Sequence, residues 1–222
     1  MSKVYIGVGH GGNDPGCIVN NLIEKDLNLV IAKECKRFLS AHGVAVKISR
    51  EIDKSMTVSE KIEECNEYNP TIAIDIHNNS GGGKGAEIFH HYGGGLGKEF
   101  SESILNEFAE IGQTIRGSKI KVNSQCVDYY GFIRETNAPA IIIECAFMDH
   151  EADVKLINTE QGLKKFGVAI AKGILVMLGI PYENGEETDR LYRVQVGAFI
   201  RKSNAERMKL ALQKAGFDAV IV

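Results

Sequence analysis

The sequence predicts an α/β fold, in which a mainly parallel twisted sheet has helices on both faces and is followed by a small C-terminal β-α-β segment. Strand-like and helix-like segments alternate along most of the chain, as they do where crossover helices join parallel strands. The segment AIIIECAF at residues 140–147 is also apolar almost throughout, which is typical of a strand that is covered on both sides.

In the first half of the chain, the predicted elements are bounded by residues that start or end regular structure. Apolar residues recur at helical spacing after Glu24, and Gly43 is placed to end that helix. Thr57 and Glu60 form the capping-box pattern that begins the next helix, and Pro70 separates this helix from the following strand. The predicted elements are a strand at 3–9, a helix from 24 to about 42, a strand at 44–49, a helix from 57 to about 68 and a strand at 71–77.

The second half of the chain continues the alternation. Large apolar residues between positions 100 and 108 lie on one face of a predicted helix, and Thr159 can cap a long helix that reaches Leu178. The segment 112–129 shows no clear period and receives no assignment. Strands are predicted near 86–91, at 130–134 and at 140–144.

The composition of the chain changes after residue 180. Residues 181–190 are acidic and polar and contain both Pro and Gly, as a linker does. Residues 191–222 have the pattern of a strand, a helix and a strand, and their six Lys or Arg against two Asp or Glu give a local charge of +4. We therefore expect a first domain at 1–180, a linker at 181–190 and a small basic segment at 191–222.

The bulk properties of the chain exclude several classes of function. Hydrophobic residues make up 44% and charged residues 25%, and a formal net charge of -3 does not favour nucleic acid as a partner. The longest apolar stretch, FGVAIAKGILVMLGI, is interrupted by Lys172 and is too short to cross a bilayer, so no membrane is expected. The N-terminus MSKVYIGVGHGG lacks the features of a signal peptide, which predicts a protein made in the cytoplasm.

Four residues that are able to bind or serve a metal stand where predicted elements begin or end. His10, His77 and Glu144 each follow or close an apolar strand, and Glu24 opens the first helix. Ligands of open α/β sheets bind beyond the carboxyl ends of the strands, so these groups are expected to converge. Each alone has an ordinary explanation, such as a turn histidine or a glutamate favoured by the helix dipole. The combination of all four indicates a site.

The residue types in this set fit a catalytic zinc ion. Zinc in such sites takes three ligands from His, Asp or Glu and leaves one position for water. The five cysteines of the chain form no CxxC pair, which argues against cysteine ligands and favours a reducing compartment. His10, Glu24 and His77 can supply two nitrogens and one carboxylate. Glu144 is an acid at the end of an apolar strand, so we expect a raised pKa and a role in carrying protons.

Four segments of the sequence resemble the motifs of a known family. VGHGGNDPG, IEKDLNL, DIHNN and APAIIIECAFM are similar, in that order, to motifs of the zinc-dependent N-acetylmuramoyl-L-alanine amidases of the amidase_3 group, over about residues 3–178. The resemblance implies that His10, Glu24 and His77 bind Zn²⁺ and that Glu144 is the catalytic carboxylate. It also implies the reaction, which is cleavage of the amide bond between N-acetylmuramic acid and L-alanine in peptidoglycan.

Some positions depart from the pattern of the family. The residues 7–9 before His10 are Gly-Val-Gly where the family commonly has Asp-Pro-Gly, and Asp75 stands where Ser is usual. Period-2 alternation along a strand puts Asp75 on the same face as His77. Asp75 is therefore expected either to orient a ligand histidine or to be solvated, and the sequence leaves both possibilities open.

The C-terminal segment resembles part of another family. YRVQVGAF at residues 192–199 is similar to the start of a SPOR domain, a peptidoglycan-binding module, and the segment 191–222 corresponds to the first half of such a module. The unpaired edge of a strand at the final residues DAVIV would favour self-association through this segment.

The sequence leaves three functions open. The first is a zinc amidase that degrades peptidoglycan as a phage endolysin or a bacterial autolysin, and that acts on the wall after release or lysis. The second is a cell-wall-binding protein whose amidase fold has lost activity, which the basic C-terminal segment would suit. The third is a zinc peptidase that cuts the stem peptide, because the same ligand set could serve an ordinary peptide bond.

Overall fold

The chain divides into two units, Met1–Tyr182 and Glu183–Val222. This computed structural model describes residues 2–182, 196–216, 219 and 221. All four residues of the candidate site belong to the first unit, and its sheet decides where they lie.

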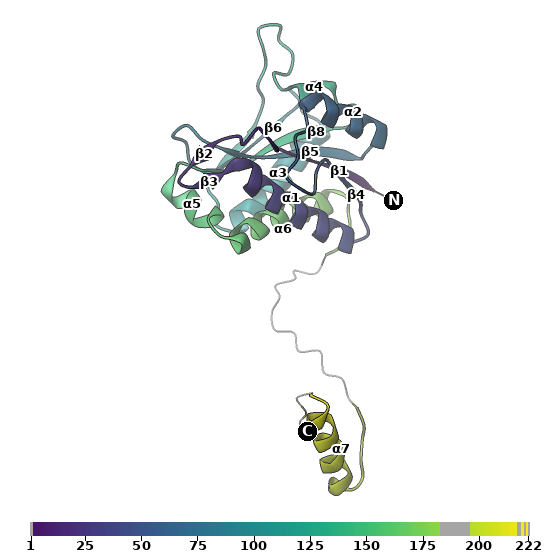
Figure 1. Cartoon of the computed structure of the whole chain (residues 1–222). Helices are drawn as coiled ribbons and strands as arrows, with labels where there is room; N and C mark the ends of the chain where they lie inside the picture. The colour runs from purple at the N-terminus through teal and green to yellow at the C-terminus, as the bar shows by residue number, and fades with distance from the viewer. Residues whose placement is uncertain (1, 183–195, 217–218, 220, 222) are drawn as a thin grey trace. The chain divides into compact units, whose positions relative to one another are not determined.

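Six strands form the central sheet of the first unit (Figure 1). They are β1 (Lys3–Val8), β4 (Ala45–Ile48), β5 (Ile72–Asn79), β6 (Ala86–His90), β7 (Ile115–Lys119) and β8 (Ala140–Phe147), and their order is β4-β1-β5-β8-β6-β7. The neighbours among β4, β1, β5 and β8 pair in parallel, whereas β6 is antiparallel to β8 and parallel to β7. The predicted mainly parallel sheet is confirmed, with two strands at one edge that run the opposite way.

Helices cover both faces of this sheet, as the sequence predicts (Figure 1). One face carries three helices that pack against one another, and the other carries two short ones. The three are α1 (Glu24–Ala41), α3 (Leu96–Glu110) and α6 (Glu160–Met177), and the two are α2 (Val58–Tyr68) and α4 (Gly131–Glu135). A small hairpin of β2 (Ile18–Val19) and β3 (Leu22–Ile23) leads into α1, and α5 (Glu151–Ile157) precedes α6.

Alternation along the strands decides which helices each side chain faces. On β5, Ile74 and Ile76 join the cluster formed with α1, α3 and α6, whereas Ala73 joins the cluster formed with α2 and α4. Since successive side chains point to opposite faces, Asp75 and His77 continue the face of Ala73. Glu24 comes from α1 on the other face, so the candidate site lies at the carboxyl edge of the sheet, where the two faces meet.

The prediction of a strand at 130–134 is wrong. This segment lies mostly in the helix α4. Phe132 and Ile133 are adjacent in sequence, and both are buried in one cluster with α2. Neighbouring residues of a strand point to opposite faces, whereas neighbours on a helix can share one buried side.

The unassigned segment 112–129 contains the strand β7 and a loop. β7 pairs with β6 at the edge of the sheet, and a single bridge between Val122 and Asp128 closes the loop that follows.

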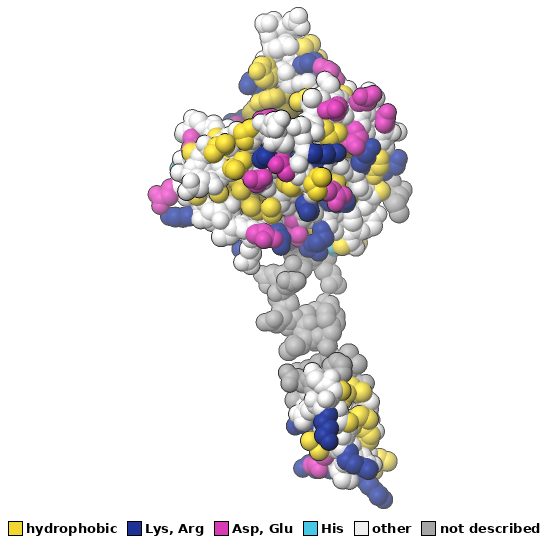
Figure 2. Space-filling model, in the orientation of Figure 1, with side chains coloured by type: hydrophobic (Ala, Val, Ile, Leu, Met, Phe, Trp, Pro, Cys, Tyr) yellow, Lys and Arg dark blue, Asp and Glu magenta, His cyan; other side chains and the backbone are white. Residues whose placement is uncertain are grey.

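In the second unit, the predicted helix is confirmed as α7 (Lys202–Lys214). None of its residues is buried, and Figure 2 shows basic and hydrophobic side chains on its visible side. The first strand predicted for the C-terminal segment falls on YRVQVGAF at 192–199. Residues 192–195 lie outside the described residues, and residues 196–199 are not in a strand. Most of the predicted linker and of the last predicted strand also lies outside the described residues. Within the described part of the chain, no helix has the length and apolar character that a membrane span requires.

Candidate metal centre

Three donor side chains converge beyond the carboxyl ends of β1 and β5. His10 follows β1, Glu24 is the first residue of α1, and His77 lies near the end of β5. One ligand atom of each lies within 4.8 Å of the others. His10 Nε2 is 3.2 Å from Glu24 Oε2, and His77 Nδ1 is 3.1 Å from Glu24 Oε1. The fold thus brings together the three residues that the sequence indicates as metal ligands.

The carboxylate of Glu24 is fixed from several directions. The backbone N–H groups of Cys17 and Asn78 donate to it at 3.0 and 3.2 Å, and Asn28 Nδ2 on the next turn of α1 donates at 3.3 Å. Burial raises the pKa of Glu24, but the hydrogen bonds with the two histidines outweigh burial and hold this pKa well below its usual range. Glu24 is therefore a carboxylate near neutral pH, and this is the form that binds a cation.

The loop that carries His10 is held by Arg50. His10 has φ 60°, a left-handed conformation that few residues other than glycine adopt and that the surroundings must enforce. The buried Arg50 donates through Nε to the carbonyl of His10 at 2.9 Å, and through Nη2 to two further backbone carbonyls at 3.2 and 2.7 Å. Gly16 lets the same loop pass close to the donors, because a Cβ there would lie 2.6 Å from both Glu24 Oε2 and His10 Cδ2.

The second ring nitrogen of each histidine faces an aspartate. His10 Nδ1 is 2.8 Å from Asp14 Oδ2, and His77 Nε2 is 3.4 Å from Asp75 Oδ2. Asp75 is buried, so the alternative that it is solvated is wrong. A carboxylate behind each histidine directs the other nitrogen towards Glu24, an arrangement common among metal-binding histidines. The donor set and its supports fit a zinc ion.

Glu144 lies beside these donors on β8. It is the register partner of His77, so the two side chains share a face of the sheet. Its Oε2 is shut off from solvent and has no hydrogen-bond partner among the described residues. Burial raises the pKa of Glu144 to about 7. A carboxyl group with this pKa can accept and release a proton near neutral pH.

Sequence reasoning missed the polar side chains that brace the donors. Asn28 donates to the carbonyl of Gly9 at 3.2 Å as well as to Glu24, and Asn78 Nδ2 donates to Asn28 Oδ1 at 2.9 Å. Both asparagines are buried. The sequence did contain an indication of the role of Asn28. It stands four residues after Glu24 and therefore lies on the same side of the helix.

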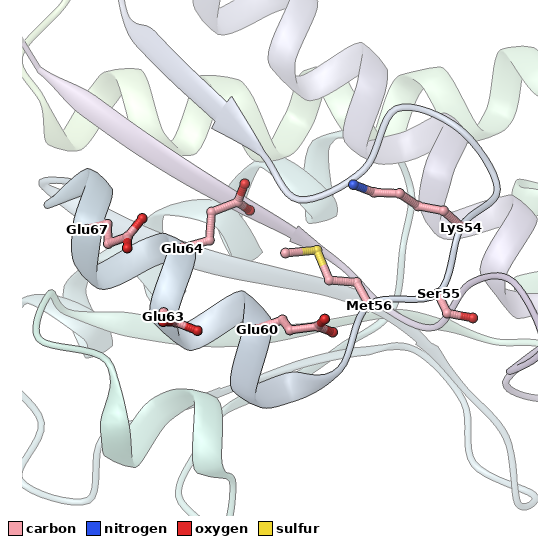
Figure 3. A pocket seen from close by; sticks show the side chains of 7 residues that line it. All are labelled: Lys54, Ser55, Met56, Glu60, Glu63, Glu64 and Glu67. Carbon is pink, nitrogen blue, oxygen red and sulfur yellow. The ribbon is translucent and has the colours of Figure 1, made fainter.

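A separate surface cavity of about 290 Å³ lies against α2 (Figure 3). None of the three donors or Glu144 lines it. Its residues have local roles: Glu60 completes the capping box of Thr57, and Ser55 Oγ donates to the carbonyl of Gly11 in the His10 loop at 3.3 Å. The lining residues are Lys54, Ser55, Met56, Glu60, Glu63, Glu64 and Glu67.

Comparisons with known proteins agree with this fold. The family N-acetylmuramoyl-L-alanine amidase (Amidase_3) matches residues 4–176, and the SPOR domain matches residues 175–222. The N-acetylmuramoyl-L-alanine amidase CwlM of Bacillus licheniformis is 27% identical over 100% of this chain and 85% of its own length. The endolysin of Bacillus phage SPP1 is 27% identical over 99% of this chain and 83% of its own.

A solved structure is similar over the same region. An N-acetylmuramoyl-L-alanine amidase from Clostridium difficile 630 superimposes with a TM-score of 0.73 and 28% identity, over 80% of this chain and 97% of that chain. The amidase match spans most of the sequence and contains the three donors and Glu144. The chain therefore belongs to the N-acetylmuramoyl-L-alanine amidase (Amidase_3) family, and its C-terminal part matches the SPOR domain.

Proposed function

We propose that the protein hydrolyses the amide bond between N-acetylmuramic acid and L-alanine in peptidoglycan, with a zinc ion held by His10, Glu24 and His77. The observation that carries the proposal is the convergence of two imidazole nitrogens and one carboxylate within 4.8 Å, inside the segment that matches the amidase family. The family match supports the reaction, and the donor set supports the metal, because catalytic zinc takes three such ligands.

A zinc ion held by His10, Glu24 and His77 would act as a Lewis acid towards the scissile carbonyl and would lower the pKa of a water molecule towards ~7. Glu144 takes a proton from the attacking water molecule as the new carbon–oxygen bond forms. The same carboxyl group then delivers the proton to the nitrogen of L-alanine as the carbon–nitrogen bond breaks. A pKa of about 7 suits both transfers. The products are a lactyl carboxyl group on the sugar, which then loses its proton to solvent, and a new amino terminus on the stem peptide.

Removal of zinc is expected to abolish hydrolysis, and its return is expected to restore it. The measurement is dye release from labelled peptidoglycan before chelation, after it, and after the addition of zinc or magnesium. Magnesium is the control, because it prefers oxygen ligands and six-fold coordination. Full activity after rigorous metal removal would rule out the zinc mechanism.

Mass spectrometry of the released fragments separates the proposed amidase from the alternative peptidase. An amidase leaves L-alanine amino termini on whole stem peptides, whereas a zinc peptidase leaves cuts inside the peptide. A protein that only binds the wall releases neither kind of fragment.

We also propose that the two parts of the chain have different functions. Residues 1–180 cleave peptidoglycan, residues 191–222 bind the cell wall, and residues 181–190 link the two parts. The SPOR match supports this proposal, although that match begins at residue 175, within α6. Likeness to a bacterial amidase and to a phage endolysin supports action on the wall as an autolysin or an endolysin, after release or lysis. Self-association through the C-terminal segment is a further part of this proposal.

A chain that ends at residue 182 is expected to bind purified cell wall more weakly than the full chain and to keep its turnover of a soluble muropeptide. Co-sedimentation with wall fragments measures the first property, and chromatography of the muropeptide products measures the second. Equal binding by both chains would contradict the proposed role of the C-terminal segment.

A further inference from the structure

We propose that Asp75 is a positioning residue that holds the imidazole of His77 for metal binding, with Lys61 as its counter-charge and Gly7 as the residue that makes room for it. The inference rests on the proposed function, because it takes His77 to be a metal ligand. It goes further by assigning a joint role to three residues outside the ligand set.

Asp75 touches His77 on the side away from the other donors. Its Oδ2 lies 3.4 Å from His77 Nε2, while His77 Nδ1 lies 3.1 Å from Glu24 Oε1. An imidazole that gives its Nε2–H to a carboxylate keeps the lone pair on Nδ1, and the hydrogen bond at one nitrogen decides which nitrogen can bind a metal. The negative charge of Asp75 beside Nε2 favours a proton on that nitrogen, and so favours the form of His77 in which the lone pair on Nδ1 points at the metal position.

Lys61 makes a buried carboxylate tolerable at this position. Its Nζ lies 2.6 Å from Asp75 Oδ2, and the side chains of both residues are only 3% exposed. Removing one charge of such a pair leaves the other uncompensated away from water, which is strongly destabilising. Lys61 comes from α2, so this helix has a function in the site beyond covering the sheet.

Gly7 supplies the space that Asp75 occupies. The two residues are register partners on β1 and β5, and a Cβ on Gly7 would lie 2.5 Å from Asp75 Oδ1. Any other side chain at position 7 would collide with the carboxylate. Gly7 and Asp75 are both positions where this sequence departs from the pattern of the family it resembles. Their contact links the two differences, because an aspartate at position 75 requires a residue without a side chain at position 7.

Gly9 extends the same close packing to the histidine itself. A Cβ on Gly9 would lie 2.4 Å from His77 Cε1. The imidazole is thus enclosed by the backbone of β1 and its end, by Asp75 behind it and by Glu24 in front of it. This packing restricts the orientation of the ring, and the neighbouring carboxylate of Asp75 favours one tautomer.

The test removes the carboxylate and its counter-charge together, so that no unpaired charge stays buried. The variant Lys61→Met/Asp75→Ala is expected to bind zinc about 10–100-fold more weakly than the wild type, the loss usual when the hydrogen-bond partner of a ligand histidine is removed. Affinity is measured in the full chain by competition with a chromophoric chelator, which does not depend on activity. The variant Lys61→Met/Asp75→Asn returns an oxygen acceptor behind His77 and is expected to recover part of the loss.

Asp153→Asn is the matched control. It neutralises another buried aspartate, one that accepts the backbone N–H groups of Gly85 and Phe147 at 2.7 and 2.8 Å. The control is expected to bind zinc as the wild type does. If Asp153→Asn loses as much zinc affinity as Lys61→Met/Asp75→Ala, the loss is not specific to Asp75. That result would overturn the inference.

The outcomes separate this inference from the function on which it rests. A wild-type chain that binds no zinc would overturn the proposed function. A wild type that binds zinc, together with a Lys61→Met/Asp75→Ala variant of equal affinity, would overturn the role of Asp75 alone. If Lys61→Met/Asp75→Ala shows no cooperative unfolding, it is not folded, and zinc affinity is compared in Lys61→Met/Asp75→Asn instead. Wild-type zinc affinity in this second variant would contradict the inference.

Discussion

Replacement of Glu144 by Gln is expected to lower the kcat of peptidoglycan hydrolysis by about 10²–10⁴-fold, the range that a general acid–base residue contributes. The amide cannot take the proton from water or return it to the leaving nitrogen. Glu144 is outside the donor cluster, so the variant is expected to bind zinc as the wild type does. Single-turnover rates and chelator competition on the same preparation measure the two properties.

Glu87→Gln is the matched control for this prediction. Glu87 is the cross-strand partner of Glu144, but its carboxylate is tied to Arg116 and Lys119 at 2.5 Å each. The same chemical change there is expected to reduce kcat far less. A Glu144→Gln protein that turns over at close to the wild-type rate would exclude the proton-carrying role.

Replacement of His77 by Ala is expected to weaken zinc binding strongly. Loss of a residue that only positions a metal ligand lowers affinity ~10–100-fold, and loss of the ligand itself is expected to lower it further. The replacement is also expected to abolish hydrolysis at equimolar zinc. The variant loses one of the three proposed protein donors, and Asp75 and Glu24 lose their contacts with the ring. Metal analysis after gel filtration gives the stoichiometry, and dye release gives the activity.

His91→Ala is the matched control for the loss of a histidine. The side chain of His91 is half-exposed and faces Asp128, and it takes no part in the donor cluster. It is expected to leave both zinc content and activity unchanged. One zinc ion retained per chain in His77→Ala would contradict the proposed ligand set.

The convergence of His10, Glu24 and His77 could be predicted from the sequence because their positions follow from local patterns. His10 and His77 follow short apolar runs rich in β-branched residues, which favour strands, and parallel strands bring their carboxyl ends to one edge of a sheet. Glu24 stands at the first position of a helix with a clear apolar period, and α1 does begin there. The sequence pattern therefore predicts that these three side chains lie near one another.

The supports of the site could not be predicted in the same way, because they depend on contacts between distant segments. Arg50 reaches carbonyls of the loop forty residues before it, and Lys61 reaches Asp75 from a helix packed on the sheet. The sequence pattern around Arg50 or around Lys61 does not indicate which distant residue each side chain contacts. The short helix α4 was missed for a related reason, since five residues carry too little period to separate a helix from a strand.

Anomalous scattering at the zinc edge from crystals of the zinc-loaded protein tests the central claim most directly. We expect one strong peak per chain, within bonding distance of His10 Nε2, His77 Nδ1 and a carboxylate oxygen of Glu24, with Glu144 beside it. A peak that lacks any one of these three donors, or that lies elsewhere in the chain, would contradict the account.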